Sequence, residues 1–236
     1  MTSEAPEAVR RRLALVLDVD DLVEAERLAI RMQPYFGVAK IGLELFSAAG
    51  PEAIGSIREL GYEVFLDLKL FDIPTTVFRA TKVLGALGVK YLTLHALGGN
   101  DVLKAGVEGL AEGADAAGLE APVSLAVTVL TSDAGAPAHI VPQRVRTALD
   151  SGCGGLVLAA EDLQTAWELA PRLVRVVPGI RLAGAETNDQ SRSATPAEAI
   201  RLGADLLVIG RTVTQAPSPE EAAQAIVDIV TAQVVR

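Results

Sequence analysis

The sequence predicts a single α/β domain built as a closed (β/α)8 TIM barrel, and three observations support this prediction. Eight short aliphatic runs recur along the 236 residues, each followed by a segment with helical spacing. The runs are nearly continuously apolar, as in strands that are covered on both faces. Eight strand–helix units in about 225 residues fit a closed barrel better than an open doubly wound sheet. No linker or repeat interrupts the pattern, so we expect residues 1–236 to form one domain, with residues 1–12 as a short lead-in.

The predicted strands are runs of five to eight residues in which valine, leucine and isoleucine recur. They comprise residues 13–19, 37–42, 62–69, 91–96, 123–130, 155–160, 174–178 and 206–210. The third run ends before Pro74, because proline removes a ladder donor and restricts the residue before it. Since each strand leads into a helix, right-handed crossovers should make all eight strands parallel.

The predicted helices lie between these strands and after the last one. They comprise residues 21–33, 50–60, 76–88, 100–117, 142–151, 161–169, 195–203 and 219–235. Their start and stop signals are Asp20 or Asp21 before the first, Gly61 after the second, Gly88 after the third, Thr195-Pro196 at the seventh and Ser218-Pro219 at the eighth. No Gly-x-Gly-x-x-Gly follows the first strand, which weakens a dinucleotide-binding interpretation.

The composition limits the possible function classes. Hydrophobic residues make up 50% of the chain, which indicates a large core and argues against disorder. A net charge of −9 without a long basic run argues against a nucleic-acid partner. No apolar stretch approaches the ~18 residues that span a bilayer, and the acidic start is not a signal peptide, so we expect a cytoplasmic protein with no membrane partner. The single cysteine, Cys153, is expected to be a small core residue.

Residues 65–76, F-L-D-L-K-L-F-D-I-P-T-T, place three charges in an otherwise apolar run. Asp67, Lys69 and Asp72 fall at the end of the third predicted strand, where buried charges are costly unless they pair or serve a function. Side chains two apart share one face of a strand, so Phe65, Asp67 and Lys69 should point the same way. The segment predicts an ammonium group flanked by two carboxylates.

Other polar residues stand at the predicted C-terminal ends of strands, where the active sites of (β/α)8 barrels form. They are Asp18, Lys40, His95, Thr131 and Arg211. Because these ends meet at one face of a barrel, the residues should converge with Asp67 and Lys69. Lys40 lies among apolar neighbours in V-A-K-I-G, which favours a functional role over a solvated lysine. Asp18 also fits a helix cap, and His95 also fits a core histidine.

The last two strands predict a phosphate site. Barrels commonly bind phosphate on the loops after strands seven and eight, with backbone N–H groups and a basic side chain. The run V-I-G-R-T-V-T offers Gly210 for close backbone approach and Arg211 for bidentate contact. Residues 178–194 exceed the usual connection of ~4–6 residues and form a candidate lid. Arg181 and Gln190 in this lid are placed to close over the same anion, although Arg181 also fits a surface charge.

Several motifs occur in a fixed order: A-K-I-G-L-E-L-F, D-L-K-L-F-D-I-P-T-T, A-V-T-V-L-T-S, P-G-I-R, N-D-Q-S-R and L-V-I-G-R-T-V-T. Together they resemble the orotidine 5′-phosphate decarboxylase family of the bacterial type, from about residue 13 to residue 230. The resemblance implies decarboxylation of orotidine 5′-monophosphate to UMP and CO2, which completes de novo UMP synthesis. It also implies a homodimer that needs no metal and no organic cofactor.

The resemblance further implies a role for each matching residue. Lys40, Asp67, Lys69 and Asp72 would form an alternating catalytic array in which Lys69 donates a proton to C6. The substrate would be bound by Asp18 at the ribose, Thr131 at the pyrimidine, Arg181, Gln190, Gly210 and Arg211 at the phosphate, and Asp72, Ile73 and Thr76 from the partner subunit. Two positions depart from the pattern of many bacterial members, which have histidine where Phe71 stands and asparagine where Thr75 stands. These departures affect local packing and the interface rather than the charged array.

Two alternatives compete with this interpretation. Metal-dependent relatives, such as 3-keto-gulonate 6-phosphate decarboxylase and hexulose phosphate synthase, resemble the chain in the Asp-x-Lys-x-x-Asp strand and the phosphate end. They bind magnesium and typically have an acidic residue where Lys40 stands, so Lys40 is the discriminating residue. The other alternative is a catalytically silent phosphate-binding barrel, which would have no reason to keep Lys40, Asp67, Lys69 and Asp72 together.

Overall fold

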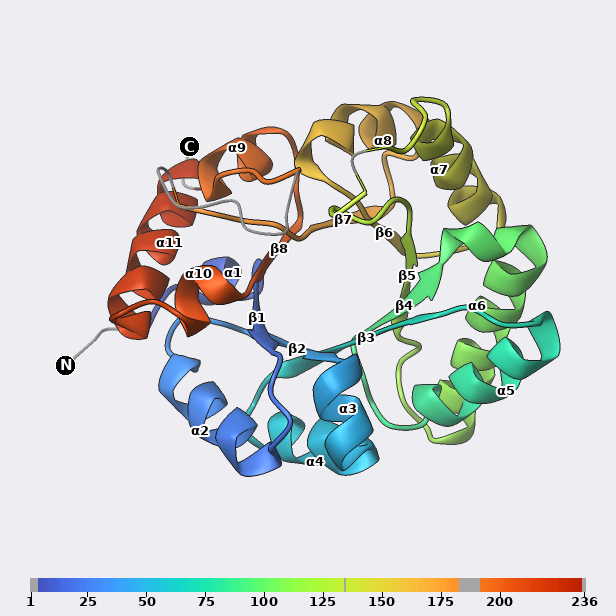
Figure 1. Cartoon of the computed structure of the whole chain (residues 1–236). Helices are drawn as coiled ribbons and strands as arrows, with labels where there is room; N and C mark the ends of the chain where they lie inside the picture. Colours follow the sequence, from blue (N-terminus) through green and yellow to red (C-terminus); the bar gives the residue numbers. More distant parts are fainter. Residues whose placement is uncertain (1–3, 134, 183–191, 235–236) are drawn as a thin grey trace.

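A computed structural model describes residues 4–133, 135–182 and 192–234 and contains a closed barrel of parallel strands in sequence order (Figure 1). The strands are β1 (Leu13–Leu17), β2 (Val38–Gly42), β3 (Glu63–Leu70), β4 (Tyr91–His95), β5 (Val123–Val127), β6 (Gly155–Val157), β7 (Val174–Val177) and β8 (Leu206–Ile209). The predicted (β/α)8 TIM barrel is confirmed. Six of the strands end one to three residues earlier than predicted, because the chain leaves the ladder to form the loops at the barrel mouth.

Helices surround the barrel. They are α1 (Glu7–Arg10), α2 (Leu22–Met32), α3 (Leu43–Ala49), α4 (Pro51–Glu59), α5 (Pro74–Gly85), α6 (Gly99–Ala116), α7 (Ile140–Asp150), α8 (Leu163–Leu169), α9 (Pro196–Arg201), α10 (Arg211–Thr214) and α11 (Pro219–Val234), with 3-10 turns η1 (Ala96–Gly98) and η2 (Ala160–Asp162). All the predicted helices are present, with ends shifted by at most three residues. The short helices α1, α3 and α10 were not predicted, because segments of four to seven residues are too short to show helical periodicity.

The predicted helix ends are set by local chemistry. The Asp21 carboxylate accepts a hydrogen bond from the Glu24 N–H at 2.8 Å, which caps α2. Thr195 and Glu198 form a reciprocal capping box at the start of α9. Gly88 follows α5 with a φ of 71°, a left-handed conformation that glycine adopts without strain. Sequence signals for these ends therefore correspond to real hydrogen bonds and dihedral angles.

The barrel interior is a packed core. Its inward-facing cluster consists of Ala14, Val16, Val38, Phe65, Leu125, Val127, Val157, Val176, Leu206 and Val208. Intervening positions such as Leu15 and Ile41 pack between the strands and the helices. Cys153 is buried in this outer cluster, and burial raises the pKa of its thiol to about 12, as befits a core residue rather than a nucleophile. Apolar side chains therefore fill the barrel below its mouth.

Helices α5 and α6 approach each other closely. A β-carbon at Gly109 would lie 2.3 Å from the carbonyl oxygen of Phe78, and one at Gly113 would lie 1.9 Å from the carbonyl oxygen of Lys82. Only glycine permits this approach. The contact therefore fixes α5, which begins directly after residues 71–73, against α6.

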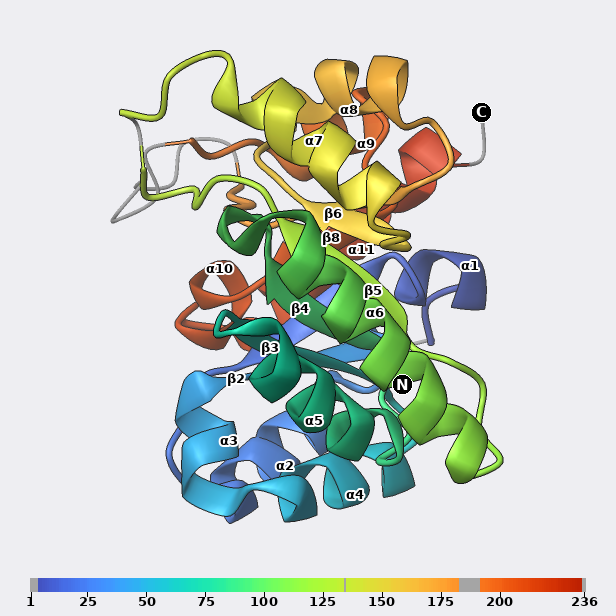
Figure 2. The same ribbon diagram turned by 90° about the vertical axis from the view of Figure 1, so that its right-hand side faces the viewer.

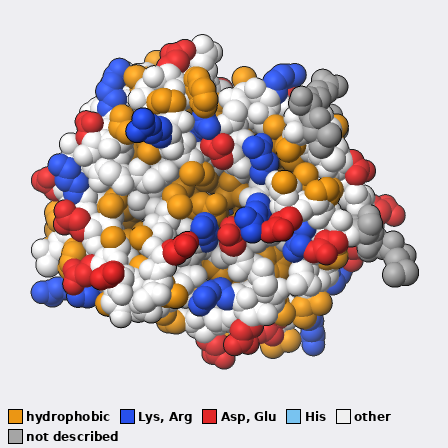
Figure 3. Space-filling model, turned by 180° about the vertical axis from the view of Figure 1, so that it is seen from behind, with side chains coloured by type: hydrophobic (Ala, Val, Ile, Leu, Met, Phe, Trp, Pro, Cys, Tyr) orange, Lys and Arg blue, Asp and Glu red, His pale blue; other side chains and the backbone are white. Residues whose placement is uncertain are grey.

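The two ends of the barrel differ in character. Figure 2 shows α10 and α1 at opposite ends, with α10 at the end where the strands finish. Figure 3 shows the other end from behind, where acidic and basic side chains are interspersed across the face. None of the described helices is long and apolar enough to cross a membrane. The groups that carry the predicted chemistry lie at the end that faces the viewer in Figure 1.

Candidate active site

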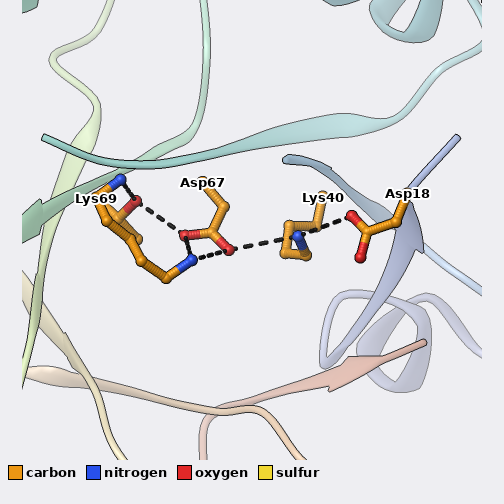
Figure 4. Close-up of polar contacts among 5 residues, drawn as sticks. Asp18, Lys40, Asp67 and Lys69 are labelled. Atoms are coloured by element: carbon orange, nitrogen blue, oxygen red, sulfur yellow. Dashed lines mark hydrogen bonds and ion pairs between the residues drawn. The ribbon is translucent and has the colours of Figure 1, made fainter. Parts of the chain in front are cut away.

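Four charged side chains form a continuous chain at the C-terminal end of the barrel (Figure 4). Lys40 Nζ lies 3.3 Å from Asp18 Oδ1 and 3.3 Å from Asp67 Oδ2. Lys69 Nζ lies 2.9 Å from each carboxylate oxygen of Asp67. The structure thus brings together four predicted site residues from the ends of β1, β2 and β3, and their charges alternate along the chain.

The strand pleat aims two of these side chains inward. Val38 and Phe65 belong to the inward-facing cluster, and Lys40 and Asp67 follow each of them by two residues on the same face. Gly42 leaves room for the ammonium group, because a β-carbon there would lie 3.0 Å from Lys40 Nζ. The side chains of Lys40 and Asp67 are only 10% and 12% exposed, so their attraction is weakly screened by solvent.

Lys69 reaches Asp67 from an irregular backbone. Its φ is 49°, the only positive φ at a non-glycine residue in the described parts of the chain. The register between β3 and β4 shifts between Leu66 and Leu70, around this residue. Such a left-handed conformation costs a lysine roughly 1–2 kcal/mol. Regular alternation therefore does not explain why Lys69 meets Asp67; a bulge in β3 does.

Thr93 on β4 holds this bulge in place, and the sequence prediction missed it. Its hydroxyl accepts a hydrogen bond from the Lys69 N–H at 2.8 Å and donates one to Asp67 Oδ1 at 3.0 Å. Thr93 is fully buried. The signal for it was a small polar side chain in the run Y-L-T-L, and alternation places that side chain on the same face as His95. Thr93 thus fixes both the backbone and the carboxylate that position the Lys69 ammonium.

The carboxyl of Asp67 is held in its charged form. Burial acts to raise its pKa, but the ammonium groups of Lys40 and Lys69 and the hydrogen bonds from Lys69 and Thr93 outweigh burial, so the pKa lies below its usual range. Asp67 therefore remains a carboxylate at neutral pH. The net result at the barrel mouth is two ammonium groups bridged by one buried carboxylate.

We predict that Asp67 makes the stability of the protein depend on pH in acid. A carboxyl with a lowered pKa in the folded state stabilises that state fully above its unfolded pKa of about 3.9. This contribution is lost as the pH falls through the folded value. Urea unfolding of the native protein and of Asp67→Asn between pH 7 and pH 3 measures the difference in free energy of unfolding, which should shrink as the pH falls below about 4. A difference that stays constant over this range would contradict the shift.

Asp72, Ile73 and Thr76 lie apart from the array. All three are exposed, and the Asp72 carboxylate accepts a hydrogen bond from the Ile73 N–H at 2.6 Å. No ion pair joins Asp72 to Lys69 among the described residues. The predicted array of Lys40, Asp67, Lys69 and Asp72 is therefore not assembled within one chain. The four linked charges are instead those of Asp18, Lys40, Asp67 and Lys69, whereas the Asp72 carboxylate bonds to the Ile73 N–H.

A cavity of about 840 Å³ opens beside the array and contains most of the predicted phosphate residues. Asp18 and Lys40 line one part of it, and Arg181, Gly210 and Arg211 line another. The cavity also reaches α2, where its lining residues include Glu24, Arg27 and Arg31. The geometry fits an elongated anionic ligand with a polar middle.

Arg181 is buried rather than a surface charge. Its guanidinium donates to the Ile180 carbonyl oxygen at 2.9 Å and to Thr212 Oγ1 at 3.4 Å. The Thr212 hydroxyl in turn donates to the same carbonyl oxygen at 2.8 Å. The loops after β7 and β8 are thereby joined at the cavity wall. Gln190, predicted to act with Arg181, lies outside the described residues.

The structure places the remaining candidates at the same end of the barrel. Thr131 is buried in the loop after β5. His95 ends β4, and its Nδ1 accepts a hydrogen bond from the Leu97 N–H at 3.2 Å, which caps η1. Burial, together with the positive charges of Arg144 and Lys69, lowers the pKa of His95. His95 is only partly buried and caps η1, so it differs from the core histidine that was the alternative.

The sequence as a whole matches a known family. Residues 11–226 match the model of the orotidine 5′-phosphate decarboxylase / HUMPS family. The chain belongs to this family. The resemblance predicted from the motifs is confirmed, and the matched region of the orotidine 5′-phosphate decarboxylase / HUMPS family spans all eight strands.

Curated members of the orotidine 5′-phosphate decarboxylase / HUMPS family align with nearly the full chain. The orotidine 5′-phosphate decarboxylase of Moorella thermoacetica is 44% identical over 227 residues, covering 91% of this chain and 90% of that protein. The one from Anaeromyxobacter sp. (strain K) is 42% identical over 226 residues, covering 91% and 96%. The crystal structure of the Lactobacillus acidophilus orotidine 5′-phosphate decarboxylase superposes with a TM-score of 0.79 at 32% identity, covering 93% of this chain and 99% of that one.

The two departures from the bacterial orotidine 5′-phosphate decarboxylase pattern lie outside the array. Phe71 and Thr75 are both exposed, and the Phe71 ring centroid lies 6.2 Å from that of His95. Across residues 4–133, 135–182 and 192–234, no three His, Cys, Asp or Glu side chains lie close enough together to hold a metal ion. The charged groups at the barrel mouth are paired with each other instead.

Proposed function

We propose that this chain decarboxylates orotidine 5′-monophosphate to UMP and CO2, as a homodimer and without a metal or organic cofactor, with Lys69 as the proton donor to C6. The observation that carries the proposal is the Asp18-Lys40-Asp67-Lys69 chain of charges beside a cavity that also contains Arg181 and Arg211. Family membership and the names of the relatives support the same reaction.

The reaction needs what this array supplies. Breaking the bond between C6 and the carboxylate carbon leaves an electron pair on C6, where no cofactor delocalises it. A fixed ammonium next to C6 stabilises that charge and then transfers its proton to the carbon, leaving a neutral amine that regains a proton from solvent. Asp67 holds the Lys69 ammonium with two 2.9 Å contacts, and the Lys40 ammonium compensates Asp67 on its other side.

The cavity accommodates the rest of the nucleotide. The hydroxyls of the ribose fit against Asp18 and Lys40, where Lys40 Nζ donates a hydrogen bond to Asp18 Oδ1 at 3.3 Å. The 5′-phosphate fits against Arg181 and Arg211, with Gly210 allowing close backbone approach. The family resemblance also assigns Gln190 to the phosphate. Thr131 is assigned to the pyrimidine. Phosphate binding far from C6 supplies energy that aligns the base with Lys69.

A homodimer accounts for the exposed apolar residues at the barrel mouth. Large exposed hydrophobic side chains follow four neighbouring strands, β2 to β5: Leu43, Phe71, Ile73, Leu97 and Leu130. Apolar groups that gather on one side of a surface mark an interaction site. Association through this surface would carry Asp72, Ile73 and Thr76 into the partner's site, which the exposed Asp72 carboxylate fits.

Lys40 favours this reaction over the metal-dependent chemistry found elsewhere in the superfamily. A magnesium ion needs carboxylate ligands, whereas here Lys40 Nζ lies 3.3 Å from both Asp18 and Asp67. An ammonium in that position repels a divalent ion and satisfies the oxygens that would bind it. A silent phosphate-binding barrel, in turn, gives no reason for a strained lysine and a buried carboxylate side by side.

The decisive experiment follows the absorbance of orotidine 5′-monophosphate with purified protein in excess EDTA. We expect complete conversion to UMP at a rate that EDTA does not change. Absence of turnover by the native protein would refute the proposed reaction, and turnover that EDTA abolishes would favour the metal-dependent alternative.

We predict that Thr93→Val lowers kcat/KM for orotidine 5′-monophosphate by about 10- to 100-fold, since a hydrogen bond to a charged group contributes ~1.5–3 kcal/mol. Valine keeps the shape of threonine but neither accepts from the Lys69 N–H nor donates to Asp67. Steady-state kinetics, with urea unfolding alongside, test this effect. An unchanged kcat/KM in a folded variant would show that the bulge holds Lys69 without Thr93.

A further inference from the structure

We propose that Arg192 is a positioning residue, which acts through Asp162 and Glu161 to hold Arg181 in place against the substrate phosphate. The inference rests on the proposed function for the identity of the phosphate-bearing ligand. It assigns a role to an arginine and a 3-10 turn that are not among the described residues lining the cavity that contains Arg181.

The first step is the pairing of the two ends of the long connection after β7. The Arg181 N–H donates to the Ala194 carbonyl oxygen at 2.9 Å, and the Ala194 N–H donates to the Gly179 carbonyl oxygen at 3.3 Å. Ile180 and Ala194 form an isolated parallel bridge between these bonds. The backbone of Arg181 therefore lies where Ala194 places it.

The second step is the anchor of the returning end. Arg192, two residues before Ala194, pairs through Nη2 with Asp162 Oδ2 at 2.5 Å and through Nε with Glu161 Oε1. Both carboxylates belong to η2, which follows β6. The Asp162 N–H donates to the Ala159 carbonyl oxygen at 3.0 Å, which ties the turn to the end of that strand.

The third step is the burial of this pair. The Arg192 and Asp162 side chains are 11% and 14% exposed, whereas Glu161 is 65% exposed. Exposed ion pairs contribute little, but removing one partner of a buried pair leaves an uncompensated charge. Asp162 is therefore the main anchor of Arg192, and Glu161 is secondary.

The last step connects the anchor to the ligand cavity. The guanidinium of Arg181 donates to the carbonyl oxygen of Ile180, the residue that bridges to Ala194. A shift of Ala194 thus moves both the backbone of Arg181 and the acceptor that orients its side chain. Because Arg181 lines the phosphate part of the cavity, the shift should affect only ligands that carry the phosphate.

The test compares two substrates in four variants: Arg192→Ala, Asp162→Asn, Glu161→Gln and the double variant Arg192→Ala/Asp162→Asn. For orotidine 5′-monophosphate we expect kcat/KM to fall by roughly 10- to 100-fold in Arg192→Ala and in Asp162→Asn, since misplacement by ~1 Å costs about that much. Glu161→Gln should lose less than about 3-fold, as exposed pairs do. For phosphate-free orotidine, kcat/KM should stay unchanged in all of them.

The double variant and a control exclude a general loss of structure. If Arg192 acts through Asp162, the double variant should be no worse than Arg192→Ala alone. Arg172→Ala, an exposed arginine at the opposite end of the barrel, should leave both substrates unaffected. Asp162→Asn preserves side-chain volume and keeps the test open should Arg192→Ala fold poorly.

A binding measurement separates this proposal from the proposed reaction. The same variants are titrated calorimetrically with UMP and with uridine, which requires no turnover. We expect Arg192→Ala to weaken UMP binding about 10-fold and to leave uridine binding unchanged. Equal losses for nucleotide and nucleoside, or no loss for the nucleotide, would overturn the role of Arg192, whether or not the native protein decarboxylates.

Discussion

Replacing Lys69 with alanine is expected to lower kcat/KM for orotidine 5′-monophosphate by at least ~10⁴-fold, because in the proposed reaction Lys69 serves both as the general acid and as the positive charge beside C6. General acid catalysis alone contributes ~10²–10⁴-fold, and one electrostatic donor contributes a further ~10²–10³-fold. Asp67 and Lys40 cannot substitute, since the first is anionic and the second is already shared by Asp18 and Asp67. Most of the loss should be in kcat, because the phosphate contacts remain.

Two further variants sharpen this test. Lys69→Arg keeps a positive charge beside Asp67, but a guanidinium does not give up a proton in proteins, so it should still lose more than ~10³-fold. Lys104→Ala, an exposed lysine on α6, should retain native kinetics. Single-turnover absorbance measurements at saturating substrate give the rate of the chemical step directly. A loss below tenfold in a folded Lys69→Ala protein would rule out Lys69 as the proton donor.

Asp72→Asn is expected to lower kcat/KM by about 10³-fold, the cost of removing a charged group that orients a catalytic residue. In the proposed homodimer the affected site is that of the partner subunit, because the Asp72 carboxylate is exposed and forms no ion pair with Lys69 within the described part of its own chain. A heterodimer experiment can therefore show whether Asp72 acts in its own subunit or in the partner's.

Heterodimers of Asp72→Asn and Lys69→Ala subunits provide that test. One of the two sites then receives a native Lys69 from one subunit and a native Asp72 from the other, so a purified heterodimer should recover about half the native activity. Differently tagged subunits, refolded together and separated, allow this measurement, with each homodimer as the control. If Asp72 served its own chain, both sites would stay defective and no activity would return. Sedimentation of an active monomer would contradict the interface altogether.

The sequence was sufficient to predict the barrel and the meeting of Asp18, Lys40 and Asp67 at its mouth for definite physical reasons. Aliphatic runs alternate with helical segments, and strand ends in a barrel converge whatever their separation in sequence, so Asp18, Lys40 and Asp67 were expected to meet. Lys40 was informative because a charge among Val38, Ala39 and Ile41 needs a partner. These predictions depend on the period of the hydrophobic residues and on the positions of charged residues along the chain, and both can be seen in a single sequence.

The remaining features depend on contacts between distant segments. A bulge at Lys69 requires the hydroxyl of Thr93 as an acceptor, and nothing in D-L-K-L reveals that partner. Arg192 was visible only as part of the motif N-D-Q-S-R, and its pairing with η2 follows from the adjacency of the loops after β6 and β7. The short helices α3 and α10 contain too few residues to show a helical period in the sequence. Local pattern locates the groups of this site, whereas tertiary contacts set their orientation.

The left-handed backbone conformation of Lys69 lowers the stability of the fold, whereas the side chain of Lys69 is needed for the proposed reaction. Glycine would occupy a φ of 49° without steric cost, so selection for stability alone would replace the lysine. Sequence design on this backbone that scores only packing and dihedral preference would therefore converge on an inert barrel. The proposed reaction gives a reason for a lysine at position 69, and the hydrogen bonds from the Lys69 N–H to Thr93 and from Lys69 Nζ to Asp67 stabilise its conformation.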